Sequence, residues 1–456
     1  MKKLVMTLFL IPFLGFGQAL SYSDLGVLFS ESNLNGTGRY SAMGGAFGAL
    51  GGDLSAMEIN PAAGAVFKLD EFGFSLSFNE LDITSYYYGN QNTVNNSNTD
   101  FEQIGFVSVT QLSASKDEIN KVYFGFNYTK TANYDQFWIA DGNSGVSTWV
   151  DDPTDPDIQY TDAEYQYFNN YTDGGKHQYS MFAGGQYGRN FYIGAGIKVH
   201  TLDFYQSTIQ EEFNNDGNGN TVDAYIEQWQ QLYGTGVSLN FGFIARLNQA
   251  LRIGLAYESP NWWSIREESN IIAPHNDPVY GYYEAEYSTD PGVIYHNNYN
   301  KLQILDYGLS SPGKLTSSAA LVLGKFGLIS FDYTWINYQN LQYTDRYFQN
   351  ENMYYSQNLE NTSNFAMGTE WRFGPASIRG GYRLYASPYK DALEDENQEE
   401  ITMGIGFNFG RFKFDLAYQF STVYSTYNFY PGYPEVQPAD LKEDFSKFTT
   451  SFLIRL

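Results

Sequence analysis

The chain has 456 residues, no cysteine and a formal net charge of −25. The lack of cysteine excludes a disulfide framework and a lipoprotein anchor, and the strong negative charge argues against a nucleic-acid partner. After the N-terminal segment no apolar run reaches about 18 residues, which excludes a helical membrane protein. Aromatic residues nevertheless make up 18% of a sequence whose mean hydropathy is −0.40. This combination is typical of a transmembrane β-barrel, in which alternate residues face lipid and aromatic girdles mark both interfaces.

The first segment predicts secretion. Two lysines precede residues 4–17, an apolar run that is too short to span a bilayer, contains Pro12 and ends in small residues. We interpret residues 1–17 as a signal peptide that is cleaved near Gly17. The alternative is a retained anchor helix, which the short length of the run disfavours.

Residues 18–70 are rich in small side chains, as in "GGDLSAMEINPAAGAVF" at 51–67. Small residues allow the backbone to pack closely against other elements. The Asn60–Pro61 step marks a turn directly before the first alternating segment. A tight, small-residue segment in this position is suited to fill a confined space.

Alternation of apolar and polar residues dominates residues 71–456. In "RFKFDLAYQF" at 411–420, all large apolar side chains fall on even positions, and the charged and small ones fall on odd positions. A strand separates these two sets onto opposite faces, whereas a helix mixes them. Fourteen segments follow this pattern: 72–88, 101–112, 120–134, 177–188, 190–206, 225–247, 250–264, 314–324, 326–342, 359–373, 376–387, 398–409, 411–425 and 444–456. We expect an all-β fold, a 14-stranded antiparallel transmembrane β-barrel.

The connections alternate in length. Those after even-numbered strands are short, such as "GRN" and "GP". Those after odd-numbered strands are long: 89–100, 135–176, 207–224, 265–313, 343–358, 388–397 and 426–443. Short periplasmic turns and long extracellular loops are the barrel rule, so the N-terminus should be periplasmic. Because 14 strands enclose more space than their side chains fill, we expect residues 18–70 to form a plug folded into the periplasmic end.

Acidic residues gather in the expected loops, as in "DDPTDPD" at 151–157 and "EDENQEE" at 394–400. Loop solvation is the simplest interpretation, and calcium bridging to anionic surface lipid is the alternative. The sequence lacks P-loop, His-Glu-x-x-His and Gly-x-Ser-x-Gly motifs, and its four histidines lack metal-ligand spacing. We therefore expect no enzyme, no catalytic residue, no cofactor and no metal.

One segment resembles a known family. "GGDLSAMEINPAAG" at 51–64 is similar to the plug signature of the FadL/TodX family of outer-membrane transporters for hydrophobic compounds. Ala63 stands where the family has glycine. "IRGGYRLYASPYKD" at 378–391 and "IGLAYESP" at 253–260 are similar to the family's strand patterns. The resemblance assigns plug or gate positions to Asp53, Ser55, Asn60, Pro61, Ala62, Ala63 and Gly64.

The resemblance implies uptake of long-chain fatty acids or other hydrophobic molecules across the outer membrane. Loops would capture the ligand, a pocket above the plug would hold it, and a shift of the plug at Asn60–Pro61 would release it sideways. The partners would be a hydrophobic small molecule, outer-membrane lipid and lipopolysaccharide, and we expect a monomer. The alternative function is a barrel component or cargo shuttle of a protein-secretion system. The expected plug argues against a general porin.

Two sets of residues are candidates for ligand binding. Aromatic clusters in the expected loops suggest a hydrophobic site: Phe137, Trp138, Trp149, Trp262 and Trp263. The alternative is that they form an interface girdle. Arg379 and Arg383 lie on the lumen parity and could hold a ligand carboxylate. They could instead pair internally with acids such as Asp332 or Asp415.

Overall fold

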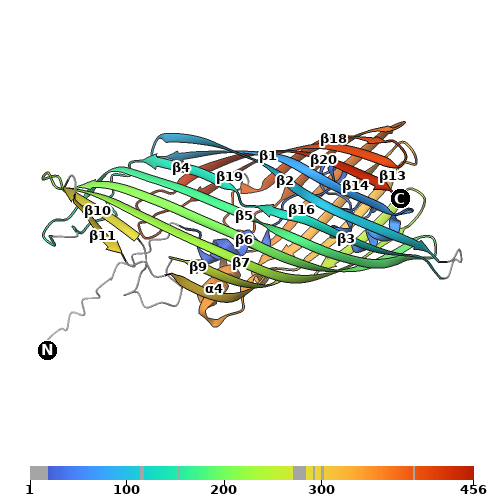
Figure 1. The fold of residues 1–456 in the computed structure, drawn as a ribbon, viewed down its shortest axis with the longest axis horizontal. Helices are drawn as coiled ribbons and strands as arrows, with labels where there is room; N and C mark the ends of the chain where they lie inside the picture. Colours follow the sequence, from blue (N-terminus) through green and yellow to red (C-terminus); the bar gives the residue numbers. More distant parts are fainter. Residues whose placement is uncertain are drawn as a thin grey trace, which may run out of the picture.

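The computed structural model describes residues 19–112, 118–152, 155–270, 284–290, 293–298, 302–393 and 396–456. The expected signal peptide, residues 1–17, lies outside the described residues, as do parts of both quoted acidic stretches. Strands run along the long axis of the molecule, with the C-terminus at one end and β10 (Glu284–Asp290) and β11 (Val293–Asn298) at the other (Figure 1). We call these the short-turn end and the long-loop end.

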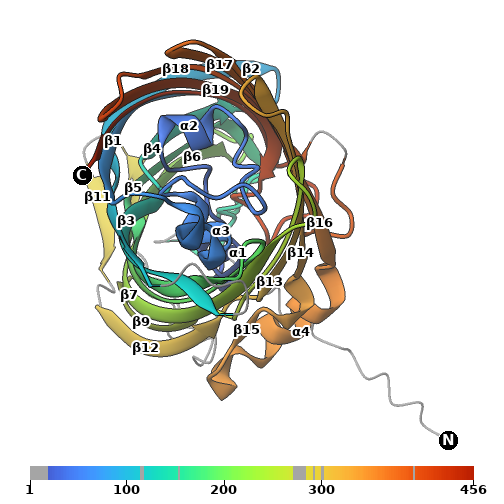
Figure 2. The same cartoon turned by 90° about the vertical axis from the view of Figure 1, so that its right-hand side faces the viewer.

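In the described ranges, 14 antiparallel wall strands close into a barrel (Figure 2). They are β1 (Glu71–Tyr87), β2 (Asn90–Gln111), β3 (Ile119–Asn133), β5 (Asp162–Tyr187), β6 (Phe191–Asn215), β7 (Thr221–Arg246), β8 (Leu251–Glu258) continued by β9 (Trp262–Ser269), β12 (Gln303–Ser310) continued by β13 (Lys314–Val322), β14 (Gly327–Asn337), β16 (Asn361–Phe373), β17 (Ala376–Tyr385), β18 (Gln398–Asn408), β19 (Phe412–Tyr427) and β20 (Ala439–Arg455). The barrel closes where β1 pairs with β20, from Glu71 opposite Arg455 onward. The predicted fold class is confirmed.

The alternation of side chains runs opposite to that of a soluble protein. In β20, Phe448 and Phe452 are exposed on the outside, whereas Lys447 and Thr449 are buried in the lumen. An apolar outer face with a polar interior is the signature of a barrel that lies in lipid. The molecule is therefore an outer-membrane β-barrel, as the sequence predicted.

Two expected loops are largely strand, which corrects the sequence interpretation. In place of loop 89–100, β1 and β2 continue to a tight turn at Tyr88 and Gly89, whose φ angles are 43° and 89°. Positive φ at both central residues is the hairpin geometry that matches strand twist. Asn95 Nδ2 donates to Asp82 Oδ1 at 2.7 Å across this hairpin. The apolar alternation is missing here because polar amide side chains occupy both faces. Likewise, β6 and β7 extend through most of 207–224.

Three other expected loops also contain regular structure. Loop 135–176 includes β4 (Gln136–Gly142) and the first part of β5. Loop 265–313 includes β10 (Glu284–Asp290), β11 (Val293–Asn298) and β12. Loop 343–358 contains the helix α4 (Gln349–Asn358). Within the described part of the chain, no helix has the length and hydropathy needed to cross a bilayer.

The regular run of wall strands is interrupted after β14. The chain leaves the sheet through η2 (Tyr338–Asn340), β15 (Gln342–Tyr343), η3 (Arg346–Phe348) and α4 (Gln349–Asn358). Figure 2 shows α4 on the outer side of the ring beside β15. On this side the recorded pairing of β12 is with β15, at Leu309–Tyr343 and Ser310–Gln342. The edge of β12 is thus covered by a short strand and a helix.

The N-terminal segment lies inside the ring (Figure 2). It contains α1 (Tyr22–Ser30), α2 (Gly38–Ser41), α3 (Ala56–Ile59) and the 3-10 helix η1 (Pro61–Val66). The last three pack against the short-turn half of the wall, whereas α1 lies closer to the long-loop end. Leu20 N donates to Gln206 Oε1 at 2.9 Å, and the Tyr22 hydroxyl donates to Glu267 Oε1 at 3.0 Å. The plug therefore extends beyond the periplasmic end where we expected it.

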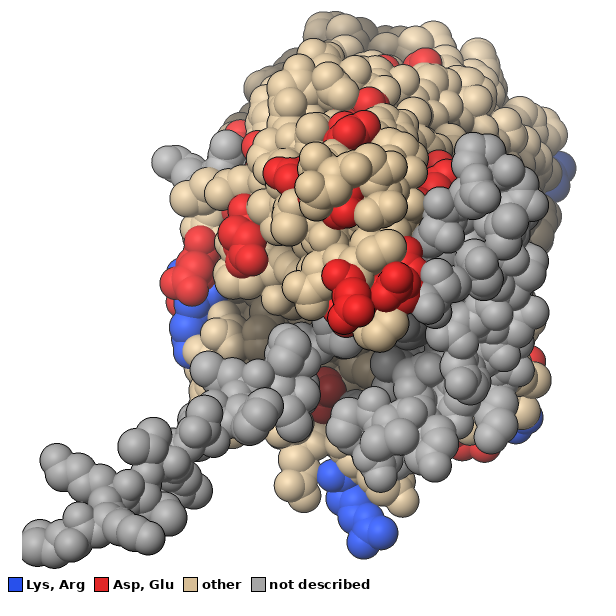
Figure 3. Space-filling view, turned by 90° about the vertical axis from the view of Figure 1, so that its left-hand side faces the viewer, with Lys and Arg blue, Asp and Glu red and all other residues tan. Residues whose placement is uncertain are grey.

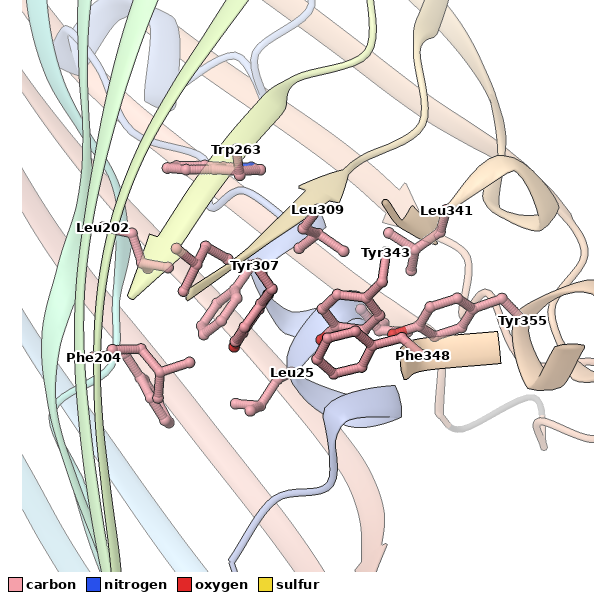
Figure 4. Packing of buried hydrophobic residues seen from close by; sticks show 14 of the residues in the cluster. Leu25, Leu202, Phe204, Trp263, Tyr307, Leu309, Leu341, Tyr343, Phe348 and Tyr355 are labelled. Carbon is pink, nitrogen blue, oxygen red and sulfur yellow. The ribbon is translucent and has the colours of Figure 1, made fainter. Parts of the chain in front are cut away.

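The position of α1 follows from its apolar face. Leu25, Val27 and Phe29 are buried in a cluster with wall and α4 side chains. Figure 4 shows this cluster, in which Tyr307, Tyr343, Phe348 and Tyr355 surround Leu25 and the helix. Aromatic rings bury a large apolar area, so this packing draws α1 toward the interrupted wall.

Candidate functional site

Asn60 connects the plug to the barrel wall. Its Oδ1 accepts from Ala62 N at 3.0 Å and so caps η1, which begins at Pro61. Its Nδ2 donates to the carbonyl of Phe243 in β7 at 3.0 Å and to that of Gly48 at 2.8 Å. A capping asparagine with proline at the first helical position is a favoured helix start. The Asn-Pro step thus starts a short helix that is tied to the wall.

Asp53 and Ser55 organise the turn before α3. Thr37 Oγ1 donates to Asp53 Oδ1 at 2.8 Å, and Ser55 N donates to the same oxygen at 3.1 Å. Ser55 Oγ donates to Gln103 Oε1 of β2 at 2.6 Å. Both residues are buried. These polar positions of the signature therefore hold the plug together and attach it to a second wall strand.

Glycines in the wall form a seat for the plug, which the sequence analysis did not recognise. A Cβ added at Gly194 of β6 would lie 2.6 Å from Pro61 C, and one at Gly242 of β7 would lie 2.2 Å from Asn60 Oδ1. Ala62 and Ala63 are fully buried against this surface. The signal in the sequence is glycine on the lumen parity of neighbouring strands.

Arg379 lies in a buried ion-pair network. Its Nε lies 2.8 Å from Glu370 Oε2 and its Nη1 lies 2.6 Å from Asp415 Oδ1. Arg39 of α2 also binds Glu370, at 2.7 Å. Internal pairing with Asp415 was the alternative that the sequence left open. The geometry favours it over the binding of a ligand carboxylate, because the charge of Arg379 is already compensated. The network fastens plug to wall.

Arg383 is partly buried beside the same strands. Its Nη1 lies 3.9 Å from Glu400 Oε2, and its guanidinium lies 5.2 Å from the centre of the Tyr385 ring. Asp332, the other proposed internal partner, accepts from the backbone N–H groups of Phe47 and Gly48 instead. Neither Arg379 nor Arg383 is among the described residues that line the cavity above the plug.

A cavity of about 1060 Å³ lies in the lumen toward the long-loop end. We call it the upper cavity. Its described lining comes mainly from α1, β1–β6 and β17–β20. Aromatic side chains contribute apolar surface: Tyr134, Phe137, Trp138, Phe204, Tyr385, Tyr389, Tyr424, Tyr427 and Phe445. A concave, partly apolar space of this size is suited to a small molecule.

The five predicted aromatic ligand contacts do not come together. Phe137 and Trp138 line the upper cavity, although Trp138 is itself packed between Phe168 and Tyr427. Trp149 is buried next to Glu212 in the loop region. The two tryptophans of β9 point to opposite sides: Trp262 is 51% exposed, whereas Trp263 is buried. The position of Trp262 fits the interface alternative.

The sequence analysis missed the polar face of the upper cavity. Glu400 of β18 lies directly opposite Ser421 of β19, and Gln419 lies on the same face two residues earlier. Glu443 of β20 lines the cavity beside them. Glu400, Gln419 and Ser421 fall on the lumen parity of predicted strands, whereas Glu443 was placed at the end of the expected loop 426–443 and lies in β20. Only the register between strands brings them together, so sequence alone gave their direction but not their grouping.

Comparisons with known proteins agree on the architecture. No family model and no curated protein matches the chain. A FadL homologue from Pseudomonas aeruginosa has a similar structure, with a TM-score of 0.60, 12% identity, and coverage of 93% of this chain and 99% of that chain. The toluene transporter TodX from P. putida gives 0.56 and 14%, with the same coverage. The CymD monoaromatic hydrocarbon channel gives 0.52 and 11%, again over 93% and 99%.

These identities are low, and the likeness shows the fold alone. It extends over nearly the whole of both chains. The fold that the resemblance implied is confirmed. This chain has the fold of the FadL and TodX outer-membrane barrels.

Proposed function

We propose that the protein takes up hydrophobic small molecules across the outer membrane. The observation that carries this proposal is the upper cavity, which is lined with aromatic side chains and lies above a plug inside a barrel of this fold. The compared structures are described as a FadL homologue, a toluene transporter and a monoaromatic hydrocarbon channel. An apolar ligand gains more from such a cavity than from a water-filled pore.

In this proposal the ligand leaves sideways, where β14 gives way to α4. The hydroxyls of Tyr343 and Tyr355 both donate to the carbonyl of Tyr22 at the start of α1, at 2.7 and 2.9 Å. These bonds connect the plug with the segment that covers the edge of β12. A shift of the plug would break them and loosen that cover. Asn60–Pro61 would act as the point from which the plug moves.

Uptake of a radiolabelled alkylbenzene by a deletion strain, with and without the protein, tests the function itself. We expect uptake only in cells that make the protein. Equal uptake in both strains would contradict the transport proposal, whatever the plug does.

A cross-link tests the plug movement separately. A Cβ added at Gly125 of β3 would lie 2.9 Å from Met57 Sδ of α3, so Met57→Cys with Gly125→Cys is the pair chosen to join plug and wall. The natural chain has no cysteine that could interfere. We expect uptake to stop in the oxidised protein and to return after reduction, with the two single-cysteine variants as controls. Full uptake through a verified cross-link would refute a moving plug and leave the transport function standing.

A further inference from the structure

The upper cavity is strongly acidic. Nine acidic residues line it: Asp24, Glu31, Asp100, Glu102, Asp135, Asp173, Glu396, Glu400 and Glu443. Among the described lining residues the one lysine or arginine is Lys130, which is bound to Asp100 at 2.7 Å. Lys447 in the wall compensates Glu102 at 2.8 Å. Most of the remaining carboxyl groups have no recorded cation close by, so acidic groups far outnumber basic ones in the described lining of the cavity.

Buried acceptors without donors lie in the same place. Glu400 Oε2, Gln419 Oε1 and Ser421 Oγ are buried atoms that have no hydrogen-bond partner within the described structure. The three residues are 1–3% exposed and line the cavity. A buried polar atom without a partner costs free energy, so an unfilled set of acceptors indicates that a donor is missing. Arg383, 3.9 Å from Glu400 Oε2, is too far away to be that donor.

Glu443 adds a carboxyl group to this face. Ser421 is opposite Phe445, and Val423 is opposite Glu443, so the carboxylate lies diagonally next to the unpaired acceptors. The structure records no hydrogen bond or ion pair for the Glu443 side chain within the described residues. Tyr385 of β17 and Tyr424 of β19 line the cavity near the same strands. Carboxylates, neutral acceptors and aromatic rings together are the surroundings that an ammonium group prefers.

The outer surface has the same sign of charge. Figure 3 faces the long-loop end and shows Asp and Glu side chains spread over it, with few Lys or Arg side chains. An acidic rim raises the local concentration of cations and repels anions before they reach the cavity. The charge that the sequence placed in the loops therefore points toward the same class of ligand as the cavity does.

We propose that the cargo of the upper cavity is an amphiphile with a primary ammonium head group, which is held by Glu400, Gln419, Ser421 and Glu443. Its three N–H donors match the unpaired acceptors, and its hydrocarbon part lies against the aromatic lining. The proposal deepens and rests on the proposed uptake function. A fatty-acid carboxylate would add another hydrogen-bond acceptor to a site whose acceptors already lack donors.

Three probes with the same alkyl chain test the head-group preference. Octylamine, octanol and octanoate are titrated calorimetrically into the full-length protein in neutral-lipid nanodiscs, with empty nanodiscs as the reference. We expect octylamine to bind about tenfold more tightly than octanol, because it forms charge-assisted hydrogen bonds. Octanoate should bind more weakly than octanol. Octanol binding as tight as octylamine would overturn the ammonium site and leave hydrophobic uptake standing, whereas binding of none of the three would contradict both proposals.

Substitutions test which residues cause the preference for an ammonium head group. Glu400→Gln and Glu443→Gln should each reduce octylamine affinity several-fold and leave octanol affinity unchanged. Because Glu443 has no recorded ion pair in the described structure, Glu443→Gln should keep the wild-type heat-modifiable gel shift. The matched control is Asp306→Asn, whose side chain is 71% exposed on the outside of β12. An unchanged preference for octylamine in the folded double variant Glu400→Gln/Glu443→Gln would overturn the proposed site.

Discussion

The two halves of the lumen differ in how they are filled and in how their polar side chains are paired. In the short-turn half the plug lies directly on wall glycines, and its arginine shares carboxylates with the wall. In the long-loop half a cavity of about 1060 Å³ remains, with unpaired acceptors and carboxylates that have no nearby cation. The first arrangement fixes a plug in place, while the second leaves space and unmet hydrogen bonds for a ligand.

Polar residues that point into the lumen differ in whether their charges and hydrogen bonds are paired. Arg379 and Glu400 lie on neighbouring strands and both point into the lumen, yet Arg379 is compensated within 2.8 Å by two carboxylates. Glu400 has one arginine at 3.9 Å and an oxygen without a donor. A charged residue in the lumen indicates function only where its partners are missing.

The largest expected effect comes from breaking the short-turn half. Arg379→Ala leaves Asp415 without its recorded arginine in a buried site, which should destabilise the barrel by about 3–5 kcal/mol. The temperature at which the folded band disappears in heat-modifiability gels should fall accordingly. The control is Arg266→Ala on β9, because the Arg266 side chain is 50% exposed and its ion pairs are 3.5 and 3.7 Å long. Its loss should cost less than about 1 kcal/mol. Equal transition temperatures for both variants would contradict the ascribed role of the network.

A bulky residue in the glycine seat should have an intermediate effect. In Gly194→Val the added Cβ would lie 2.6 Å from Pro61 C, and this overpacking should cost about 1–3 kcal/mol. We expect the plug to lift and the single-channel conductance in planar bilayers to rise. The matched control is Gly380→Val on β17, where the nearest atom to an added Cβ is Thr402 O at 3.9 Å. If Gly194→Val kept the conductance of the wild type, the seat would not hold the plug.

The smallest expected effect is a change of octanol affinity in the long-loop half. Phe137 lines the upper cavity and is 36% exposed, so Phe137→Ala should weaken octanol binding by about 1 kcal/mol through lost apolar contact. Trp262→Ala on the outer face should leave octanol affinity unchanged. Calorimetry in nanodiscs measures both. A larger loss for Trp262→Ala would move the hydrophobic site from the lumen to the outer wall.

The strand pattern was predictable because lipid and lumen impose opposite demands on neighbouring residues. The alternation in residues 411–420 is the alternation of β19, with Phe412 and Phe420 outside and Asp415 and Gln419 inside. The same rule failed for residues 90–98, where both faces are polar and no period marks the strand. It also gave no indication of α4, whose sequence "QNENMYYSQN" lacks an amphipathic pattern but whose Tyr355 is fully buried against α1.

The site was less predictable than the fold. The signature around Asn60 indicated a plug, but its contact with wall glycines depends on residues more than a hundred positions away. The tryptophans at 262 and 263 looked equivalent in sequence, and strand pleating placed them on opposite sides of the wall. Phe137 and Trp138 line the cavity, but the same aromatic pattern also drew attention to Trp149, Trp262 and Trp263, which do not.

By itself the sequence determined the number of wall strands, the face of the barrel to which each side chain points, and the small-residue character of the segment inside it. Period-2 alternation carries that information locally, one strand at a time. The tertiary structure alone decided which inward residues meet. Strand register sets Glu400 opposite Ser421, and the closed ring lets Arg379 reach Asp415 across one intervening strand. Whether a charged side chain is paired depends on its neighbours on adjacent strands. The ion-pair network and the unpaired cavity face can therefore be told apart only in the folded barrel.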